Sequence, residues 1–287
     1  MSSLCDLHLH TTASDGSETP TQLVEHARGL GLRVIAITDH DSTEGVAEAL
    51  AAARDGGLEV IPGIEVSTDV PKGEVHVLGY FVNTGCQELQ STLRLLRESR
   101  VGRARKMVSK LAALGMPLDY GRVREIAGAG SVGRPHVAQA LLEKGYVATL
   151  AEAFERYIGR NGPAYVERYK LTPAEAVGLV LRAGGLPGLA HPVIIGAAEP
   201  LGGEYDLDSL LAELVGAGLV AMECYYTGYP PEVTDSLLAK AHALNLVPTG
   251  GSDYHGSNLV GPVLGGVDVP LSTVAELKAR RAEREGD

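Results

Sequence analysis

The stretch DLHLHTTASDGS at residues 6–17 begins with an apolar strand pattern and ends in a polar turn. His8 and His10 are two residues apart, and a β-strand places side chains at that spacing on one face. Asp15 follows in the turn directly after the strand. Imidazole and carboxylate groups are common metal ligands, so this stretch predicts a strand that ends at a metal-binding site.

Six further candidate ligands occur in or directly after apolar runs: His40 in ITDHDS, Glu65 in GIEVS, His76 in GEVHVLGY, His191 in LAHP, and Asp253 with His255 in GSDYH. In a parallel barrel, such residues meet at the carboxyl ends of the strands. His76 is an exception, because it lies early in its predicted strand. His26 and His242 lie within helical patterns, and we interpret them as ordinary core or surface residues.

Strand patterns alternate with helical patterns along most of the chain. We predict strands at residues 4–10, 33–38, 58–66, 75–82, 186–191, 218–225 and 246–250. We predict helices at residues 20–31, 43–55, 172–183, 207–217, 231–244 and 271–284. This alternation favours a parallel sheet with helices outside, and seven strands favour a closed or nearly closed α/β barrel. The sequence contains no GxGxxG or GxxxxGK[ST] motif, so dinucleotide and P-loop sites have no support.

The segment 86–170 differs from the rest of the chain, because it has helical patterns and no convincing strand. It contains fifteen Lys or Arg and eight Asp or Glu, a balance of +7, whereas the remainder has ten and twenty-eight, a balance of −18. We predict a barrel domain formed by residues 1–85 and 171–287, with residues 86–170 inserted as a basic helical subdomain that caps the substrate. A solvated helical face is the alternative interpretation of these charges.

The composition of the chain argues against several classes of protein. The chain has 287 residues, 45% of them hydrophobic, and a net charge of −11, which disfavours a protein that lies along nucleic acid. Its three cysteines form no CxxC pair, so neither a disulfide framework nor a thiolate zinc site is predicted. The sequence shows no signal-peptide pattern and no apolar run near the 20 or so residues of a membrane span. We expect a cytoplasmic protein with no membrane partner and no obligate protein partner.

The motifs resemble those of the PHP (polymerase and histidinol phosphatase) superfamily of metal-dependent phosphoesterases. The matching segments are DLHLHTTASDGS, ITDHDS, GIEVS, EVHVLGY, AHP and GSDYH. The GRPHVA segment at 133–138 and the helical insertion make the chain most similar to the phosphatases of nucleoside 3′,5′-bisphosphates. The resemblance implies a distorted (β/α)7 TIM-like barrel with an α-helical insertion.

The resemblance also implies two to three divalent metal ions. The first would take His8, His10, Glu65 and Asp253, the second Glu65, His76 and His191, and the third Asp15, His40 and His255. Ligands of this kind suit Mn²⁺, Fe²⁺ or Zn²⁺, and we expect Mn²⁺. We hypothesise that a hydroxide held between metal ions attacks phosphorus, so that no protein nucleophile is needed.

Arg134 and His136 flank Pro135 at a predicted helix start. Proline at the first helical position would make Arg134 the N-cap residue and place His136 in the first turn, where a phosphate group binds readily. The resemblance implies the same role for both side chains. An ordinary helix start with exposed side chains is the alternative.

We therefore predict a metal-dependent hydrolase that removes a phosphate from a small nucleotide. The preferred substrate is a nucleoside 3′,5′-bisphosphate, from which loss of the 3′-phosphate would convert pAp to AMP. The first alternative is a 5′-to-3′ exoribonuclease acting on short RNA. A non-catalytic module that binds metal or nucleotide is disfavoured because all nine ligands are present, and GRPHVA argues against histidinol-phosphate phosphatase activity.

Overall fold

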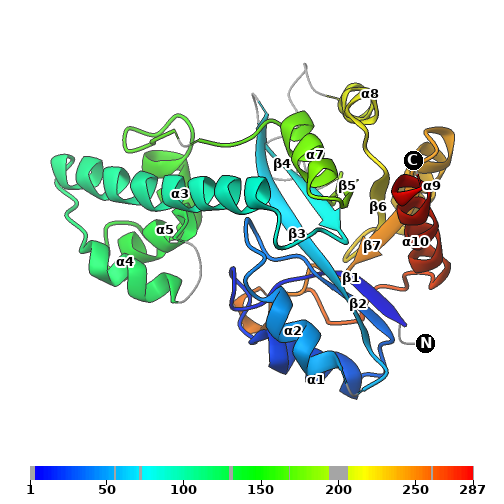
Figure 1. The fold of residues 1–287 in the computed structure, drawn as a ribbon. Helices are drawn as coiled ribbons and strands as arrows, with labels where there is room; N and C mark the ends of the chain where they lie inside the picture. The colour runs from blue at the N-terminus through cyan, green and yellow to red at the C-terminus, as the bar shows by residue number, and fades with distance from the viewer. Residues whose placement is uncertain are drawn as a thin grey trace. The chain divides into compact units, whose positions relative to one another are not determined.

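The chain forms two compact units, which we call the barrel unit (Met1–Gln90 with Lys170–Asp287) and the helical unit (Ser91–Tyr169). The structure is a computed structural model, shown in Figure 1. The residues that it describes are 4–54, 56–70, 73–128, 132–167, 169–193, 206–259 and 261–286.

Seven strands form the sheet of the barrel unit and follow one another in sequence order (Figure 1). They are β1 (Cys5–Leu9), β2 (Val34–Ile37), β3 (Glu59–Val70), β4 (Gly73–Tyr80), β5 (Leu186–Leu189), β6 (Ala221–Tyr226) and β7 (Val247–Gly251). The residues after β7 return to β1, where the Asp253 N–H donates to the His8 carbonyl at 3.0 Å. A Cβ atom on Gly251 would lie 2.5 Å from the backbone nitrogen of His8, so this close approach requires glycine. The predicted nearly closed seven-stranded barrel is confirmed.

The prediction of a parallel sheet is wrong at β4. The pairs β1–β2, β2–β3, β5–β6 and β6–β7 are parallel, but β4 pairs antiparallel with both β3 and β5. Only residues 71 and 72 separate β3 from β4, and a parallel crossover needs a dozen or more residues. Because β4 runs in the opposite direction, its first residues lie at the rim where the parallel strands end. His76 pairs with Ser67 at this rim, which explains its early place in the strand.

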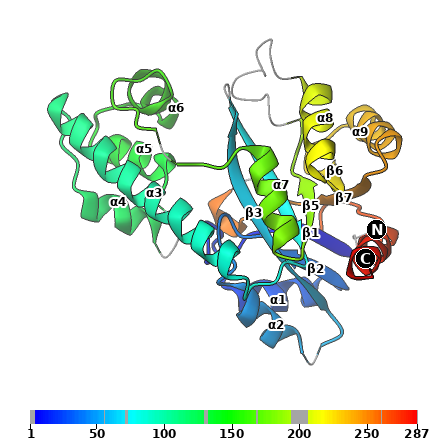
Figure 2. The same cartoon turned by 45° about the horizontal axis from the view of Figure 1, so that its top comes forward.

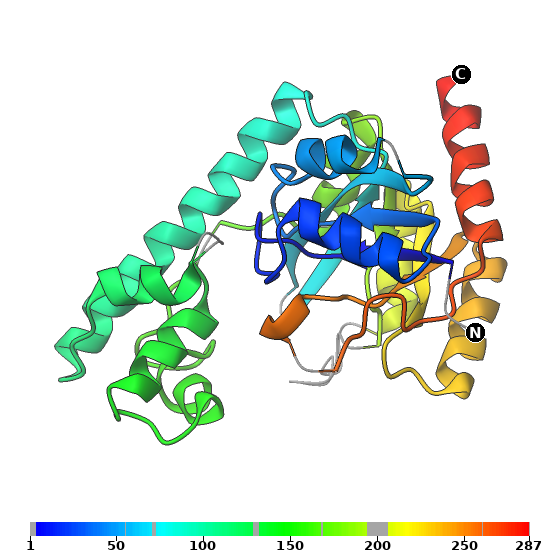
Figure 3. The ribbon, with the colours of Figure 1, turned by 90° about the horizontal axis from the view of Figure 1, so that it is seen from below.

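Helices cover the outside of the barrel unit: α1 (Pro20–Gly29), α2 (Val46–Ala53), α7 (Pro173–Arg182), α8 (Leu207–Ala217), α9 (Pro231–Ala243) and α10 (Ser272–Glu285). Figure 1 shows α1 and α2 side by side below β1 and β2, and Figure 2 shows α7 beside β5. Helix α7 contacts both β4 and β5. Figure 3 shows α10 (red) above α9 (orange), and both helices contact β7. At the start of α1 and of α7, Thr19 and Thr172 each form a capping box directly ahead of a proline.

Strand β1 is buried on both faces, and this burial positions the candidate ligands. Leu9 faces outward and packs with Leu23 of α1 and Ile35 of β2 in one apolar cluster. His8 and His10 alternate with the leucines and therefore point to the inner side of the sheet. Buried polar rings need polar partners, so the inner side must supply them.

The helical unit contains most of α3 (Gln87–Ala113), followed by α4 (Tyr120–Ala127), α5 (Arg134–Glu143), α6 (Leu150–Ala153) and a π-helical turn (Phe154–Ile158). Its core contains Met107, Leu111, Val137 and Leu141, all fully buried. Its described residues include no strand, which agrees with the predicted helical insertion. Across the described parts of both units, no helix combines the length and the apolar content needed to cross a bilayer.

Candidate metal centre

The structure brings the nine predicted side chains together at one rim of the barrel unit. One group, whose ligand atoms all lie within 4.8 Å of one another, consists of His8, His10, Glu65 and Asp253. Two more groups meet the same limit, namely His10 with Asp15, His40 and His255, and His40 with Glu65 and His76. His191 reaches the same region, because its Nε2 lies 3.1 Å from Glu65 Oε1.

His10, His40 and Glu65 each belong to two of these groups, so the groups are linked by shared residues. Within the described residues, the grouping therefore differs from the three sets implied by the resemblance, in which only Glu65 is shared. The His10 and His255 rings are stacked with centroids 4.0 Å apart, and the His10 and His40 centroids are 4.5 Å apart. Such close imidazoles form one continuous cluster rather than isolated sites.

Glu65 lies at the centre of the cluster. Its fully buried carboxylate has ring nitrogens of five imidazoles within 3.2 Å, those of His8, His10, His40, His76 and His191. It lies in β3, and an isolated bridge to His40 brings the segment after β2 beside it. A buried carboxylate is stable when it is paired or binds a metal ion, so its surroundings suit a ligand shared between ions.

Several buried polar atoms of the cluster lack a hydrogen-bond partner within the described part of the chain. They are His8 Nε2, both ring nitrogens of His10, His40 Nδ1, Glu65 Oε2 and His191 Nδ1. Most lie close to a carboxylate or ring nitrogen, but without hydrogen-bonding geometry. Buried polar groups in proteins normally have hydrogen-bond partners. Unpartnered nitrogen and oxygen lone pairs that point toward one another form a site suited to a cation. The mixture of imidazole and carboxylate groups fits divalent metal ions.

The carboxylates of the cluster control the protonation of its imidazoles. Burial lowers the pKa of His40, but Glu65 and Asp15 outweigh this effect and raise that pKa to about 9. Burial also opposes charge on His8, yet three neighbouring carboxylates raise its pKa well above the ordinary range. Burial acts to raise the pKa of Glu65, but the surrounding imidazoles hold it well below the usual value. A metal ion that binds His8 and His40 must therefore displace protons from these two rings.

We expect the apparent affinity for a divalent metal ion to rise as the pH rises from 6 to 9. A pKa of about 9 means that His40 carries an extra proton below pH 9, and the metal ion must displace that proton. Affinity should rise by up to about tenfold per pH unit for each proton displaced. Calorimetric titration in buffers of different ionisation enthalpy counts the released protons. An affinity that stays constant over this range would contradict the described charge state.

Sequence reasoning missed two side chains that support the cluster. Glu223 of β6 is fully buried and lies beside His8 and the backbone of His191. The Tyr226 hydroxyl donates a hydrogen bond to Asp253 Oδ2 at 2.7 Å. A carboxylate inside the apolar run AMECYY was the available signal for Glu223, because an acidic side chain in a buried strand needs a partner.

Two candidate ligands have a backbone conformation that costs free energy. The φ angles of His191 and Asp253 are +27° and +56°, and neither residue is glycine. Such conformations cost on the order of 1–3 kcal/mol each and are frequent at functional sites. Hydrogen bonds from both backbone N–H groups hold them in place, one to Glu223 and the other to the His8 carbonyl.

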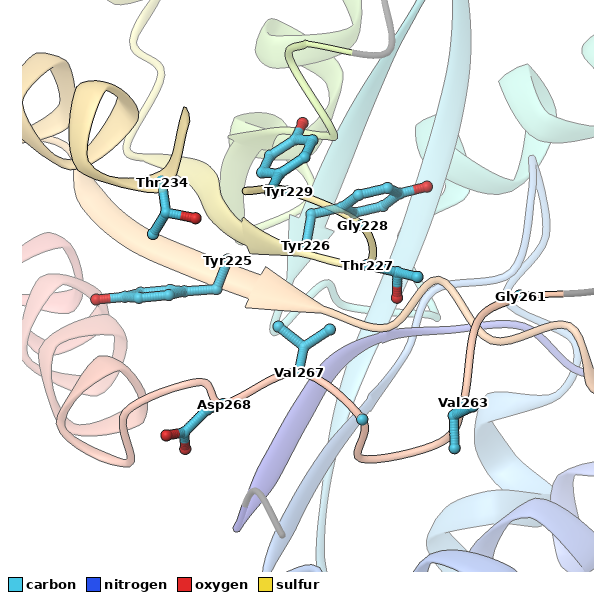
Figure 4. A pocket seen from close by; sticks show the side chains of 11 residues that line it. Tyr225, Tyr226, Thr227, Gly228, Tyr229, Thr234, Gly261, Val263, Val267 and Asp268 are labelled. Atoms are coloured by element: carbon cyan, nitrogen blue, oxygen red, sulfur yellow. The ribbon is translucent and has the colours of Figure 1, made fainter. Parts of the chain in front are cut away.

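A pocket of about 360 Å³ opens between the loop after β6 and the segment that contains Val263 and Asp268 (Figure 4). Tyr225, Tyr226 and Tyr229 contribute to its wall. Tyr226 also holds Asp253, so the pocket borders the cluster.

Arg134 and His136 belong to the helical unit, at the amino end of α5. The helix begins one residue earlier than predicted, because Gly133 is the N-cap and Arg134 is already helical. The Gly133 N–H donates to His136 Nδ1 at 2.9 Å, which places His136 in the first turn. The Arg134 guanidinium lies over the Phe154 ring, 5.7 Å from its centroid.

Comparison with known proteins gives the family. A family model described as the PHP domain matches residues 6–162, more than half of the chain. The chain belongs to the PHP domain family. This PHP protein is 31% identical over 270 residues to a 3′,5′-nucleoside bisphosphate phosphatase from Chromobacterium violaceum, covering 92% of this chain and 90% of the relative.

Two further comparisons extend over most of the PHP protein. It is 32% identical over 250 residues to a 5′-3′ exoribonuclease from Haemophilus influenzae, covering 87% of this chain and 89% of the relative. A solved structure from Bifidobacterium adolescentis, described as a metal-dependent phosphoesterase, matches with a TM-score of 0.80 and 33% identity over 96% of both chains. The predicted family is confirmed, and so is the predicted enzyme class, a hydrolase acting on phosphate esters.

Proposed function

We propose that the PHP protein removes the 3′-phosphate from a nucleoside 3′,5′-bisphosphate. The proposed hydrolysis of a phosphate ester is supported chiefly by the buried imidazole–carboxylate cluster centred on Glu65. The substrate class is supported by the likeness to the Chromobacterium violaceum phosphatase over 92% of this chain.

We propose that the nine side chains of the cluster hold about two to three divalent ions, with Mn²⁺ preferred and Fe²⁺ or Zn²⁺ as alternatives. Bound ions of this kind supply Lewis-acid stabilisation of phosphoryl oxygens and activation of water. Glu65, at the centre of the cluster, would contribute a carboxylate to more than one of these ions. The Tyr226 hydroxyl keeps Asp253 oriented, and the backbone at His191 and Asp253 directs their side chains to the cluster.

A panel of substrates tests the proposed activity. Adenosine 3′,5′-bisphosphate, adenosine mononucleotides and short 5′-phosphorylated RNA are each incubated with the Mn²⁺-loaded protein. We expect one phosphate to be released from the bisphosphate, leaving the 5′-monophosphate, at a kcat/KM at least about tenfold above that for the other substrates. Equal hydrolysis of all monoesters, or no hydrolysis of any, would contradict the proposal.

A 5′-to-3′ exoribonuclease is the second candidate. It is favoured by the Haemophilus influenzae relative and by the excess of basic residues in the segment 86–170. In the same panel, it would shorten RNA stepwise from the 5′ end. Its rate would fall steeply with salt concentration, because extended contacts to an RNA backbone release counterions.

We propose that Arg134 and His136 bind a phosphate group of the substrate, at the amino end of α5 in the substrate-binding helical unit. A guanidinium beside a helix N-terminus offers charged and backbone donors for phosphate oxygens. We expect Arg134→Ala to raise KM about 10- to 100-fold, because a hydrogen bond to a charged group contributes about 1.5–3 kcal/mol. Steady-state kinetics measure this effect.

The matched control is Arg124→Ala, which removes an exposed arginine from α4 of the same unit. We expect its kinetic constants to stay within about twofold of the wild type. Equal effects of the two substitutions would show that only the general charge of the helical unit matters and would remove Arg134 from the proposed site.

A further inference from the structure

Glu223 is a fully buried carboxylate that touches two candidate ligands from outside the cluster. Both of its oxygens lie 3.1 Å from His8 Nδ1, and Oε2 accepts a hydrogen bond from the His191 N–H at 2.7 Å. We propose that Glu223 is a positioning residue that holds His8 and His191 in the geometry required to bind metal ions. This inference rests on the proposed function, because it presumes that the cluster binds metal.

The contact with His8 selects one tautomer of its ring. A neutral imidazole carries one proton, and with that proton on Nδ1 the His8 ring donates a hydrogen bond to the Glu223 carboxylate. The lone pair then resides on Nε2, which lies 3.2 Å from Glu65 Oε2 and 3.3 Å from Asp253 Oδ1. The ring nitrogen that faces the first ligand group is therefore the one free to bind an ion.

The contact with His191 fixes the backbone. His191 has a φ of +27°, a conformation that a non-glycine residue adopts at a cost. The hydrogen bond from its N–H to Glu223 stabilises this conformation, and its Nε2 then lies 3.1 Å from Glu65 Oε1. One side chain on β6 thus controls a ligand on β1 and another after β5.

The variant Glu223→Gln tests this role with little change in side-chain volume. An amide has one acceptor oxygen, so it cannot accept from His8 and His191 through two oxygens as the carboxylate does. We expect the metal-depleted variant to bind Zn²⁺ about 10- to 100-fold more weakly than the wild type in a chelator competition assay, since loss of an outer partner typically has that effect.

The matched control is Asp6→Asn. Asp6 of β1 is also a buried carboxylate. It accepts hydrogen bonds from the backbone N–H groups of Ser252 and Gly265 at 2.8 and 2.9 Å and a longer one from that of His8 at 3.5 Å, and none of these donors is an imidazole ring. We expect this variant to lower thermal stability while its Zn²⁺ affinity stays within about threefold of the wild type. If Glu223→Gln binds Zn²⁺ as tightly as the wild type, or no more weakly than Asp6→Asn, the role of Glu223 is overturned.

A second measurement uses the wild type alone, so it tests the role of Glu223 even if Glu223→Gln fails to fold. Nitrogen-15 NMR of histidine side chains in the Zn²⁺-loaded wild type reports which ring nitrogen of His8 is protonated. We expect the proton on Nδ1, and a proton on Nε2 would overturn the inference. A wild type that binds no Zn²⁺ would overturn the proposed metal centre itself, whereas normal Zn²⁺ binding with the other tautomer overturns only the role of Glu223.

Discussion

The substitution Glu65→Gln is expected to lower kcat for phosphate-ester hydrolysis by about 10³-fold, equivalent to about 4 kcal/mol of transition-state stabilisation. Glu65 is fully buried, and five imidazoles surround its carboxylate within 3.2 Å. A neutral amide keeps the shape of the side chain but removes the negative charge that neighbouring ions would share. Steady-state kinetics and elemental analysis of the same sample measure both consequences.

Glu59→Gln is the matched control for this experiment. Glu59 begins the same strand, is exposed, and pairs with exposed Lys278 at 2.7 Å. Exposed ion pairs contribute about 0–1 kcal/mol, so we expect activity and metal content to remain near those of the wild type. A Glu65→Gln variant that keeps wild-type turnover and metal content would show that Glu65 is not the central ligand.

The substitution Asp253→Asn is expected to reduce kcat by about 10²- to 10³-fold. Asp253 Oδ1 lies 3.3 Å from His8 Nε2 and 3.1 Å from His10 Nε2, so the amide would weaken the first ligand group directly. Titration of the variant with Mn²⁺, followed by turnover, separates lost metal affinity from lost chemistry. Full activity at every Mn²⁺ concentration would exclude Asp253 as a ligand.

Tyr226→Phe provides the matched comparison for Asp253. It removes only the hydroxyl that donates to Asp253 Oδ2 and leaves the carboxylate in place. A single hydrogen bond contributes about 1–1.4 kcal/mol, so we expect a loss of about 5- to 10-fold. Equal losses in the two variants would show that the carboxylate acts through Tyr226 rather than as a ligand.

Local sequence patterns predicted most of the barrel. The strand that contains His8 could be predicted because leucines alternate with histidines, and the helix predicted at residues 20–31 corresponds to α1. The direction of β4 was not predicted, although the short connection at residues 71 and 72 excludes a parallel crossover. Because β4 runs antiparallel to β3, His76 reaches the cluster from near the start of its strand rather than from the end.

The candidate ligands could be selected from sequence because each follows or interrupts an apolar strand, but their arrangement could not. The distances that place His10 and His40 in two groups each depend on how separate strands converge. The role of Glu223 also depends on how strands come together in the fold, because Glu223 contacts His8, a residue 215 positions away along the chain. The sequence marks Glu223 as a buried acid without indicating its partners.

The most direct test of the metal centre is the metal content of the fully active wild type, measured together with turnover on adenosine 3′,5′-bisphosphate as Mn²⁺ is removed and restored. The described cluster predicts about two to three ions per chain, loss of turnover when they are removed by a chelator, and recovery when Mn²⁺ is returned. Full turnover by a chain that contains fewer than one ion would contradict a metal-dependent reaction at this cluster.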